Sequence, residues 1–455
     1  NKLSPRTNCG TVQLGDSGDT ITIPAGATIT NNGTAAGFGA TGAASWDTTV
    51  KTASFTGVAG VGYFVNTTSG AITVTLPASP DAGAVIAVKD YANTFDTNNV
   101  TLARNGSNIG GQATDATLST EGLAVTLVYV DATKGWLVTD NGTQDTAPTA
   151  QFITATGGTV LTCGNFKTHV FTGPGTFCVS CAGNAQGSNS VDYLVVAGGG
   201  GVVSGGGGAG GFRVSNSVGC VPAPTMSPLS NSTGLSITAQ GYPITVGAGG
   251  AATPDPPAIV TDTYSGNPST FSTITSTGGG FGQSNDKPVS GGPGGSGGGG
   301  GRSSTTNPGA GNGNTPPVSP PQGNNGASTG ASAPYKGGSG GGAGSAATPS
   351  NGATDSTAGA GSFIADAFIG GCAPSFGTPG PVSSTRYFSG GGGAGGGNGG
   401  SGQAGGVGGG GTGSDTDQGP PGLGGTNTGG GAGGSDGSAS KAGGSGIVMI
   451  RYKFQ

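Results

Sequence analysis

Two apolar segments bracket a long glycine-dominated tract, and this arrangement limits the possible folds of the chain more than any other feature. The first segment, VDYLVV at 191–196, passes directly into AGGGG at 197–201. The second, IVMIRYKF at 447–454, follows GGSG at 443–446. A flexible glycine tail needs no β-rich segment at its far end. The two segments are therefore predicted to be paired or neighbouring strands that hold together the ends of one folded glycine domain.

The glycine tract cannot be stabilised by burying side chains, because it has few of them. Glycine accounts for 105 of 455 residues and charged residues for 8% of the chain, against roughly 7% glycine and 25% charge in ordinary domains. Ordering the backbone of one residue costs about 1–2 kcal/mol, and glycine loses the most freedom. The tract is therefore either disordered or held by backbone hydrogen bonds between packed segments.

The ordered arrangement that we expect is a bundle of polyglycine-II helices, which are left-handed and extended with three residues per turn. Such a helix has no internal hydrogen bonds, but neighbours without Cβ atoms can approach closely and bond sideways. A collagen triple helix is excluded, because GGPGGSGGGGG at 291–301 has no strict period of three. The alternative is a flexible Gly/Ser linker, against which the length of the tract, its bracketing segments and its apolar islands argue. These islands are 211–213, 242–246, 271–274, 363–365 and 387–388.

The predicted fold class is all-β, with four regions along the chain. Residues 1–45 are expected to form a connector or shaft, and residues 46–143 a small β-sandwich module. Residues 144–197, which begin with a polar linker at 144–147, are expected to form the β scaffold of the C-terminal domain. Residues 198–455 are then the glycine-rich domain of packed polyglycine-II helices, closed by a C-terminal strand.

Local patterns support this division. In the second region, short runs rich in β-branched residues alternate with turn signals, which is typical of a sandwich, and Trp136 and Tyr129 are expected in its core. A hairpin is predicted at 18–30, where copies from other chains would stabilise a motif that is marginal alone. Polar insertions rich in Pro, Asn, Asp, Ser and Thr predict loops within the glycine domain. They lie at 252–269, 302–334 and 412–428.

Several segments resemble modules of bacteriophage tail fibres. They are ITVTLPASPDAGAVIAVKDYANTFDTNNVTL at 72–102, VTLVYVDATKGW at 125–136, HVFTGPGTF at 169–177 and the two bracketing segments. The resemblance covers most of residues 11–455, and the chain is similar in composition to phage adhesins with glycine-rich tips. It implies stacked polyglycine-II helices that form a rigid core, with joining loops that touch the host receptor. It also implies a homotrimer in the virion tail, joined to other tail proteins through the N-terminus.

The cysteines allow two interpretations. Cys163, Cys178 and Cys181 lie close together in the sequence, and a disulfide among them is expected if the particle matures outside a reducing cytosol. Free, small side chains are the equal alternative. A zinc site that includes His169 is disfavoured, because the usual second short-spaced pair of ligands is missing. No metal or other cofactor is predicted. The remaining cysteines are Cys9, Cys220 and Cys372.

The composition argues against catalysis and nucleic-acid binding. The chain has one histidine, which excludes most two-histidine metal sites and most nucleophile–base triads. Asp415 and Asp417 lie in glycine- and serine-rich surroundings and are expected to be solvated loop acids, as are Asp286, Asp366 and Asp436. Fifteen scattered basic residues and a net charge of −5 leave no nucleic-acid footprint. No apolar run reaches the length of a membrane span. The chain is predicted to be neither an enzyme nor inserted in a membrane.

Two classes of function remain. In the first, the chain is a virion tail-fibre subunit that attaches the particle to a bacterial surface glycan or outer-membrane protein. Its candidate receptor-contacting residues are Tyr264, Arg302, Asn325, Tyr335 and Lys336. In the second, the chain is a structural fibre protein, extracellular or in the virion, without receptor-binding activity. Exchanging the insertion loops between related chains separates the two, since host range follows the loops only in the first.

Overall fold

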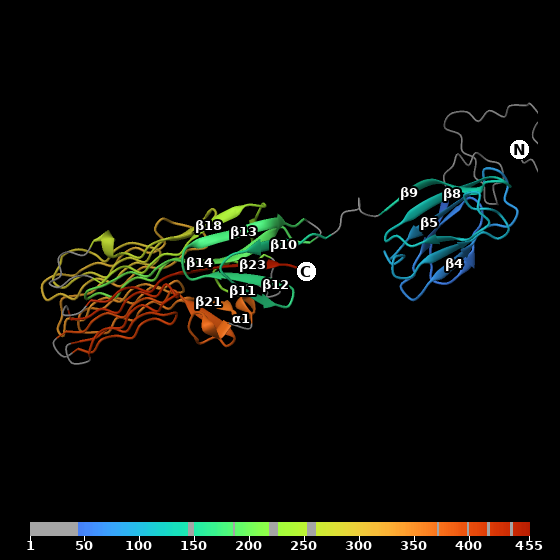
Figure 1. Cartoon of the computed structure of the whole chain (residues 1–455). Helices are drawn as coiled ribbons and strands as arrows, with labels where there is room; N and C mark the ends of the chain where they lie inside the picture. The colour runs from blue at the N-terminus through green and yellow to red at the C-terminus, as the bar shows by residue number, and fades with distance from the viewer. Residues whose placement is uncertain are drawn as a thin grey trace, which may run out of the picture. The chain divides into compact units, whose positions relative to one another are not determined.

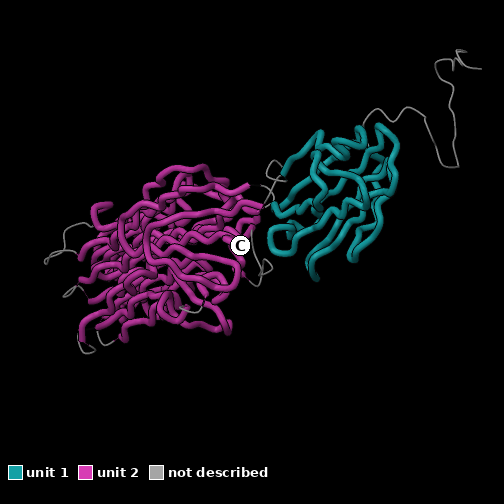
Figure 2. Tube along the Cα trace, turned by 45° about the vertical axis from the view of Figure 1, so that its right-hand side comes forward, with its two compact units in different colours: residues 1–148 teal, residues 149–455 magenta. Residues whose placement is uncertain are grey.

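The fold is nearly all β and divides into two compact units, residues 1–148 and 149–455 (Figures 1 and 2). Among the described residues, helix is limited to α1 (Asp366–Ile369) and two short 3-10 turns, η2 (Asp262–Tyr264) and η3 (Ala373–Ser375). None of these is long and apolar enough to cross a bilayer. The computed structural model describes residues 44–143, 150–184, 187–217, 226–252, 261–370, 373–397, 400–415, 419–436 and 440–455.

Some predictions fall on residues outside these ranges. The connector or shaft at 1–45, with its hairpin at 18–30, lies almost wholly there, as does the linker at 144–147. So do Asp417 and three of the cysteines, Cys9, Cys220 and Cys372. Each unit is therefore described below from its own strands and core.

Unit 1 contains two sheets that enclose one core. The five-stranded sheet has the order β1-β3-β5-β8-β9, and the four-stranded sheet the order β2-β4-β6-β7. From β1 to β6, successive strands alternate between the sheets, so that β1, β3 and β5 are parallel neighbours, as are β2, β4 and β6. The strands are β1 (Ser45–Lys51), β2 (Phe55–Thr56), β3 (Val61–Val65), β4 (Ile72–Thr75), β5 (Val85–Asp90), β6 (Val100–Ala103), β7 (Ala116–Leu118), β8 (Ala124–Asp131) and β9 (Gly135–Gly142).

The core of unit 1 follows from the alternation of side chains along its strands. In β4, Ile72 and Val74 are buried while the threonines between and after them are only partly buried, as a strand with one face on a core requires. Trp136 is fully buried and meets Tyr129 edge-on, with ring centroids 5.6 Å apart. The prediction of a core aromatic is confirmed for Trp136, whereas Tyr129 is partly buried and packs against the core.

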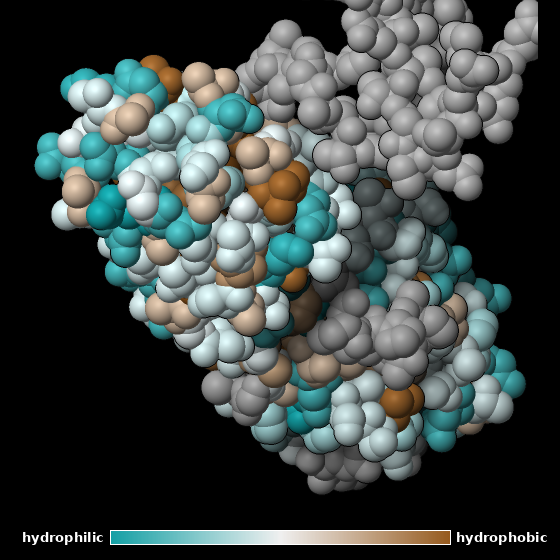
Figure 3. Space-filling model, turned by 90° about the vertical axis from the view of Figure 1, so that its right-hand side faces the viewer, coloured by the Kyte–Doolittle hydropathy of each residue, from teal (hydrophilic) through white to brown (hydrophobic). Residues whose placement is uncertain are grey.

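Exposed apolar side chains of unit 1 are scattered. Val58, Tyr91 and Val138 are the most exposed large examples and lie on different segments of the unit, with Tyr91 57% exposed. On the face drawn in Figure 3, hydrophobic residues stand in small separate patches among hydrophilic ones. Scattered residues of this kind are ordinary on protein surfaces.

Unit 2 begins with two sheets and a smaller third layer (Figure 1). The five-stranded sheet has the order β10-β13-β18-β19-β20, and the seven-stranded sheet the order β11-β12-β23-β14-β15-β16, with β17 paired to β14. The hairpin of β21 (Ser362–Ala365) and β22 (Thr385–Phe388) lies with α1 in the third layer. The other strands are β10 (Ile153–Thr156), β11 (Thr159–Cys163), β12 (Phe166–Phe171), β13 (Gly175–Ala182), β14 (Ser190–Val196), β15 (Phe212–Ser215), β16 (Ser230–Asn231), β17 (Leu235–Ser236), β18 (Gly241–Thr245), β19 (Ser269–Phe271), β20 (Ile274–Ser276) and β23 (Ile447–Lys453).

The centre of unit 2 is the antiparallel pair of β14 and β23, which is the pairing that the sequence predicts for the two bracketing segments. Its register places Val196 opposite Ile447. One face of the pair packs against the five-stranded sheet, and the other against the third layer. Both strands are buried along nearly their whole length. Coverage on both faces explains why they are continuous apolar runs instead of alternating ones.

The apolar islands of the glycine tract return the chain to these sheets. Phe212 begins β15, Phe271 ends β19, and Phe388 ends β22. All three rings are at most 1% exposed. Each island therefore fixes the ends of the glycine segments that precede and follow it.

Between the strands, glycine-rich segments lie side by side and hydrogen-bond to one another through their backbones. We call this assembly the glycine lattice; its principal segments are 197–211, 277–283, 291–301, 337–344, 389–397 and 429–436. Most of their residues are buried, although they belong to no helix or strand. Backbone groups that are removed from water need partners, and in the lattice those partners are the backbones of neighbouring segments.

Hydrogen bonding in the lattice has a period of three residues. Every amide from 205 to 211 donates to another segment, and amides three positions apart donate to the same one. The acceptors are Gln283, Gly280 and Thr277 for Gly205, Gly208 and Gly211, then Gly338 and Gly341 for Gly206 and Ala209, then Ala432 and Gly429 for Gly207 and Gly210, at 2.8–3.0 Å. One segment thus contacts three neighbours, whereas a β-strand with its period of two can bond only to two.

Close approach of the backbones makes glycine a requirement at most lattice positions. A Cβ atom added at Gly207 would overlap the carbonyl oxygen of Gly200. At Gly337 the nearest atom would be the carbonyl oxygen of Ser204 at 3.2 Å, a tight contact that a shift of a few tenths of an ångström relieves. The two positions differ in the space available and not in burial, since both are buried.

Gly207→Ala should therefore destabilise unit 2 by roughly 1–3 kcal/mol, the usual cost of overpacking, whereas Gly337→Ala should leave the unfolding midpoint close to that of the wild type. Thermal unfolding of the two full-length variants measures this difference. Equal shifts in the two variants would contradict a lattice held by close backbone contact.

His169 is the single histidine of the chain and is fully buried in the central sheet. Its Nδ1 lies 2.7 Å from the carbonyl oxygen of Gly157 and its Nε2 lies 3.0 Å from the hydroxyl of Tyr452. A carbonyl only accepts, so Nδ1 donates and Nε2 accepts from Tyr452, which is the neutral tautomer. Burial lowers the pKa of His169 below its ordinary value, because removal from water disfavours the charged ring.

Acid should consequently destabilise unit 2 through this residue. Below about pH 6.5 the unfolded chain binds a proton at His169 that the folded chain does not, so the stability present above that pH is lost as the pH falls, by up to about 1.4 kcal/mol per pH unit. Urea unfolding at pH 7.5 and pH 5 measures the loss. His169→Gln, which cannot titrate, is the control. An undiminished loss in that variant would assign the pH dependence to other groups.

Candidate functional site

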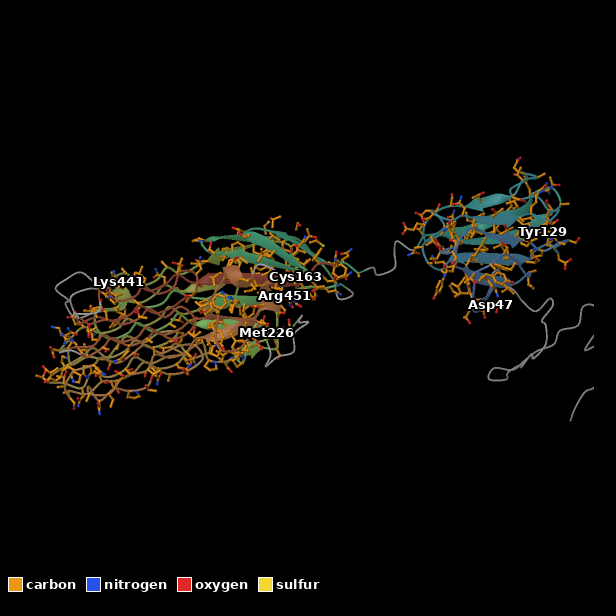
Figure 4. The ribbon with its side chains drawn as sticks, turned by 90° about the horizontal axis from the view of Figure 1, so that it is seen from below. Asp47, Tyr129, Cys163, Met226, Lys441 and Arg451 are labelled. Carbon is orange, nitrogen blue, oxygen red and sulfur yellow. The ribbon has the colours of Figure 1, made fainter. Side chains whose placement is uncertain are left out.

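The side chains that can contact a ligand gather where the glycine segments turn back at the end of unit 2 away from the sheets, here called the far end. Figure 4 places Lys441 at this end, opposite Cys163 and Arg451 in the sheets. Lys441 bridges to Val202, and the amide of Ser435 donates to the carbonyl of Val203 at 2.8 Å. The far end is thus defined by residues 202–204, 435–436 and 440–441, and by the turns that bond to them.

Arg302 is tied to this end by three elements. Its amide donates to the hydroxyl of Ser204 at 3.2 Å, and its Nη2 donates to the carbonyl of Asp436 at 2.6 Å. The Nδ2 of Asn285 donates to the same carbonyl at 2.6 Å. The local sequence explains the position, because the run of five glycines at 297–301 belongs to the lattice and the chain leaves the lattice at Arg302.

A pocket of about 200 Å³ opens beside Arg302. Three turns that are distant in sequence form it, at 285–290, 302–308 and 330–336. At about 30 Å³ per water molecule, it has room for one small ring-sized ligand. Its lining residues are Asp286, Arg302, Ser303, Ser304 and Tyr335.

The five candidate receptor residues fall into different surroundings. Arg302 and Tyr335 line the same pocket, and Lys336 follows directly and pairs with Asp355. Tyr264 packs against Val203 and Phe281, which gives its ring a packing role. The structure therefore brings Arg302 and Tyr335 together in one pocket, with Lys336 beside Tyr335 in the chain, and places Tyr264 at the far end outside the pocket.

Asn325 lies along the lattice and not in a turn at the far end. Its Oδ1 accepts from the amide of Gly313 at 2.8 Å, and its carbonyl accepts from the amide of Ala347 at 3.1 Å. The expectation that 302–334 is an insertion loop is wrong for much of its length, because residues on either side of Asn325 bond within the lattice. The loop was predicted from the polar residues of this stretch, which also occur in lattice segments.

Two acidic residues differ from the sequence expectation. Asp286 is exposed, as a loop acid, but it lines the pocket. Asp415 is only 8% exposed, so the prediction of a solvated acid is wrong there. The pocket serines, Ser303 and Ser304, carried no signal in the sequence beyond their position after the arginine that ends a run of glycines.

The chemistry of the pocket is that of binding. It offers a guanidinium, a carboxylate, the exposed hydroxyl of Ser304 and a phenol, which can donate to and accept from a polar ligand. Metal-ligating side chains do not gather there or elsewhere in the described part of the chain. His169 lies in the central sheet with both ring nitrogens hydrogen-bonded.

The three described cysteines carry free thiols: Cys163 and Cys178 are exposed, and Cys181 is partly buried. Cys178 and Cys181 lie three residues apart on β13, and a strand advances about 3.3 Å per residue, so they are about 10 Å apart. A disulfide tolerates Cα separations up to about 7 Å, so a bond between these two requires backbone movement. A disulfide that involves Cys163 stays a prediction.

Iodoacetamide should modify Cys163 and Cys178 of the native chain several-fold faster than Cys181, since exposure controls access. Peptide mass mapping separates these three sites from the other cysteines, and the chain unfolded in guanidinium is the control in which all three react alike. Protection of Cys163 or Cys178 that a reductant relieves would show a disulfide instead.

Comparison with known families finds one relationship. A family model described as a glycine-rich domain matches residues 172–453. No curated protein matches the chain. The matched range ends with β23 and contains the lattice and the whole pocket.

Proposed function

Since the chain belongs to the glycine-rich domain family through residues 172–453, we propose that its lattice is a rigid carrier for a binding surface, and that the chain is a bacteriophage tail-fibre subunit that attaches the virion to a bacterial surface. The observation that carries the proposal is the pocket at the far end, which three separate turns build from polar and aromatic residues. The resemblance of both units to phage tail-fibre modules supports the same function.

The lattice segments are proposed to be polyglycine-II helices. Their three-residue period of hydrogen bonding supports this, because that helix has three residues per turn and leaves every amide free for a neighbour. No glycine within 198–211 has a positive φ, in keeping with an extended helix of that hand. Such packing gives the far end a fixed geometry without a large apolar core.

The remaining parts of the proposal concern assembly. The subunit is proposed to be a homotrimer of the virion tail, in which the N-terminal region joins other tail proteins. The support is the resemblance and the hairpin predicted at 18–30. The receptor is proposed to be a surface glycan or an outer-membrane protein, and no catalytic step is required.

Binding of the fluorescently labelled full-length chain to a panel of bacterial isolates tests the attachment. Tyr335→Ala should weaken binding to a recognised isolate at least tenfold, because a few aromatic residues usually carry most of the energy of an interface. Tyr91→Ala removes an exposed tyrosine from unit 1, outside the pocket, and should leave binding unchanged. Binding to no isolate by a folded chain that still assembles into particles would contradict attachment and favour a purely structural fibre.

A further inference from the structure

The guanidinium of Arg302 is a positioned cation without a carboxylate partner. Among the described residues, the ion pairs are Lys51 with Asp47 and Lys336 with Asp355. Nη2 donates to the carbonyl of Asp436, and Nε is buried without a hydrogen-bond partner, so the donors left for a ligand are those of Nη1 and the second N–H of Nη2. A guanidinium presents its donors as a planar fork that matches the two oxygens of a carboxylate or phosphate. The pocket is therefore prepared for an anionic group.

Asp286 restricts which anion the pocket accepts. Its Oδ1 receives hydrogen bonds from the amide and the hydroxyl of Ser304 at 2.9 and 3.3 Å. This fixes the orientation of the carboxylate and leaves Oδ2 as an acceptor in the same pocket as Arg302. A carboxylate repels a ligand that is anionic throughout, such as free phosphate, but accepts a hydrogen bond from a hydroxyl. The ligand must carry an anionic group and hydroxyls at separate positions.

The backbone supports a binding role for the same residues. Asp286 has φ 50° and Tyr335 has φ 61°, so two of the five lining residues are in the left-handed region. Aspartate enters this region with some ease, but for a bulky residue such as tyrosine it is uncommon. Strained residues of this kind cluster at ligand sites. The strain at Tyr335 places an amphipathic ring at the pocket, with an apolar face and a hydroxyl.

We propose that this pocket binds a hexuronate, a sugar acid, as part of a bacterial surface polysaccharide. The carboxylate of the sugar pairs with the guanidinium of Arg302, and a ring hydroxyl donates to Asp286. The hydroxyl oxygen of Ser304, which is exposed, and the phenol of Tyr335 supply further hydrogen bonds, while the ring of Tyr335 covers the C–H face of the sugar. This assignment rests on the proposed attachment function only for the source of the sugar, since the pocket chemistry is independent of it.

Calorimetric titration of the full-length chain with D-galacturonate, D-galactose and inorganic phosphate at low ionic strength tests the proposal. Galacturonate and galactose differ at C6, where one has a carboxylate and the other a hydroxymethyl group. Galacturonate should bind at least tenfold more tightly than either of the other two. Arg302→Lys, which keeps the charge but loses the fork, should weaken galacturonate at least tenfold. Lys441→Gln, which removes a charge at the same end outside the pocket, should leave the affinity unchanged.

A second variant gives an effect of opposite sign that misfolding cannot produce. Asp286→Asn removes the repulsion and should increase the affinity for phosphate several-fold while it weakens galacturonate. Equal affinities of the wild type for galacturonate and galactose, tighter binding of phosphate than of galacturonate, or an Arg302→Lys variant with unchanged affinity would each overturn the proposal.

Cell binding separates this proposal from the proposed function. Polygalacturonate should compete with bacteria for the labelled chain. Cell binding that neither polygalacturonate nor Arg302→Lys reduces would overturn the hexuronate site and leave attachment standing. Galacturonate binding that Arg302→Lys abolishes, in a chain that attaches to no cells, would support the site and overturn attachment.

Discussion

Backbone hydrogen bonding between closely spaced glycine segments is the interaction on which unit 2 depends. One such bond contributes only about 0.5–1.5 kcal/mol net, similar to the cost of ordering the residue that makes it. A single pair of segments is therefore not stable by itself. Each segment hydrogen-bonds to several neighbours, as residues 205–211 do. Ordering one segment therefore provides partners for several others, and the lattice becomes cooperative.

The sheets provide what the lattice lacks, which is a large apolar driving force and a fixed register. The pair of β14 and β23 joins the two ends of the lattice, and its two faces belong to the two apolar clusters of unit 2. Burial of these side chains contributes about 25 cal/mol per Å² of apolar surface. The apolar islands do the same along the chain, because their buried side chains attach further glycine segments to the sheets. The lattice is thus anchored at one end and left with polar turns at the other.

The strand pairing at the centre of unit 2 could be predicted from sequence, because two long apolar runs next to glycine have few other uses. The core of unit 1 could also be predicted, from the alternation of residues such as Ile72 and Val74. The parallel pairing of strands in unit 1 could not be predicted, because alternation shows which residues are buried and not which sheet a strand joins. Nor was the burial of Arg451, which stacks 3.7 Å from the ring centroid of Phe166 and is 2% exposed; its partner lies 285 positions away in the chain.

The candidate site could be predicted only in part, because it too depends on contacts between residues that are distant in the sequence. Arg302 and Tyr335 were chosen for their residue types, but their meeting in one pocket depends on the order of segments in the lattice, which a glycine-rich sequence does not encode locally. The lattice itself explains why the chemistry lies at the far end. Wherever a Cβ atom would overlap a neighbouring backbone, as at Gly207, a functional side chain is excluded. The sheets cover the other end. Side chains can therefore change in the turns of the far end without destabilising the lattice. The rigid segments beneath these turns hold the side chains in place.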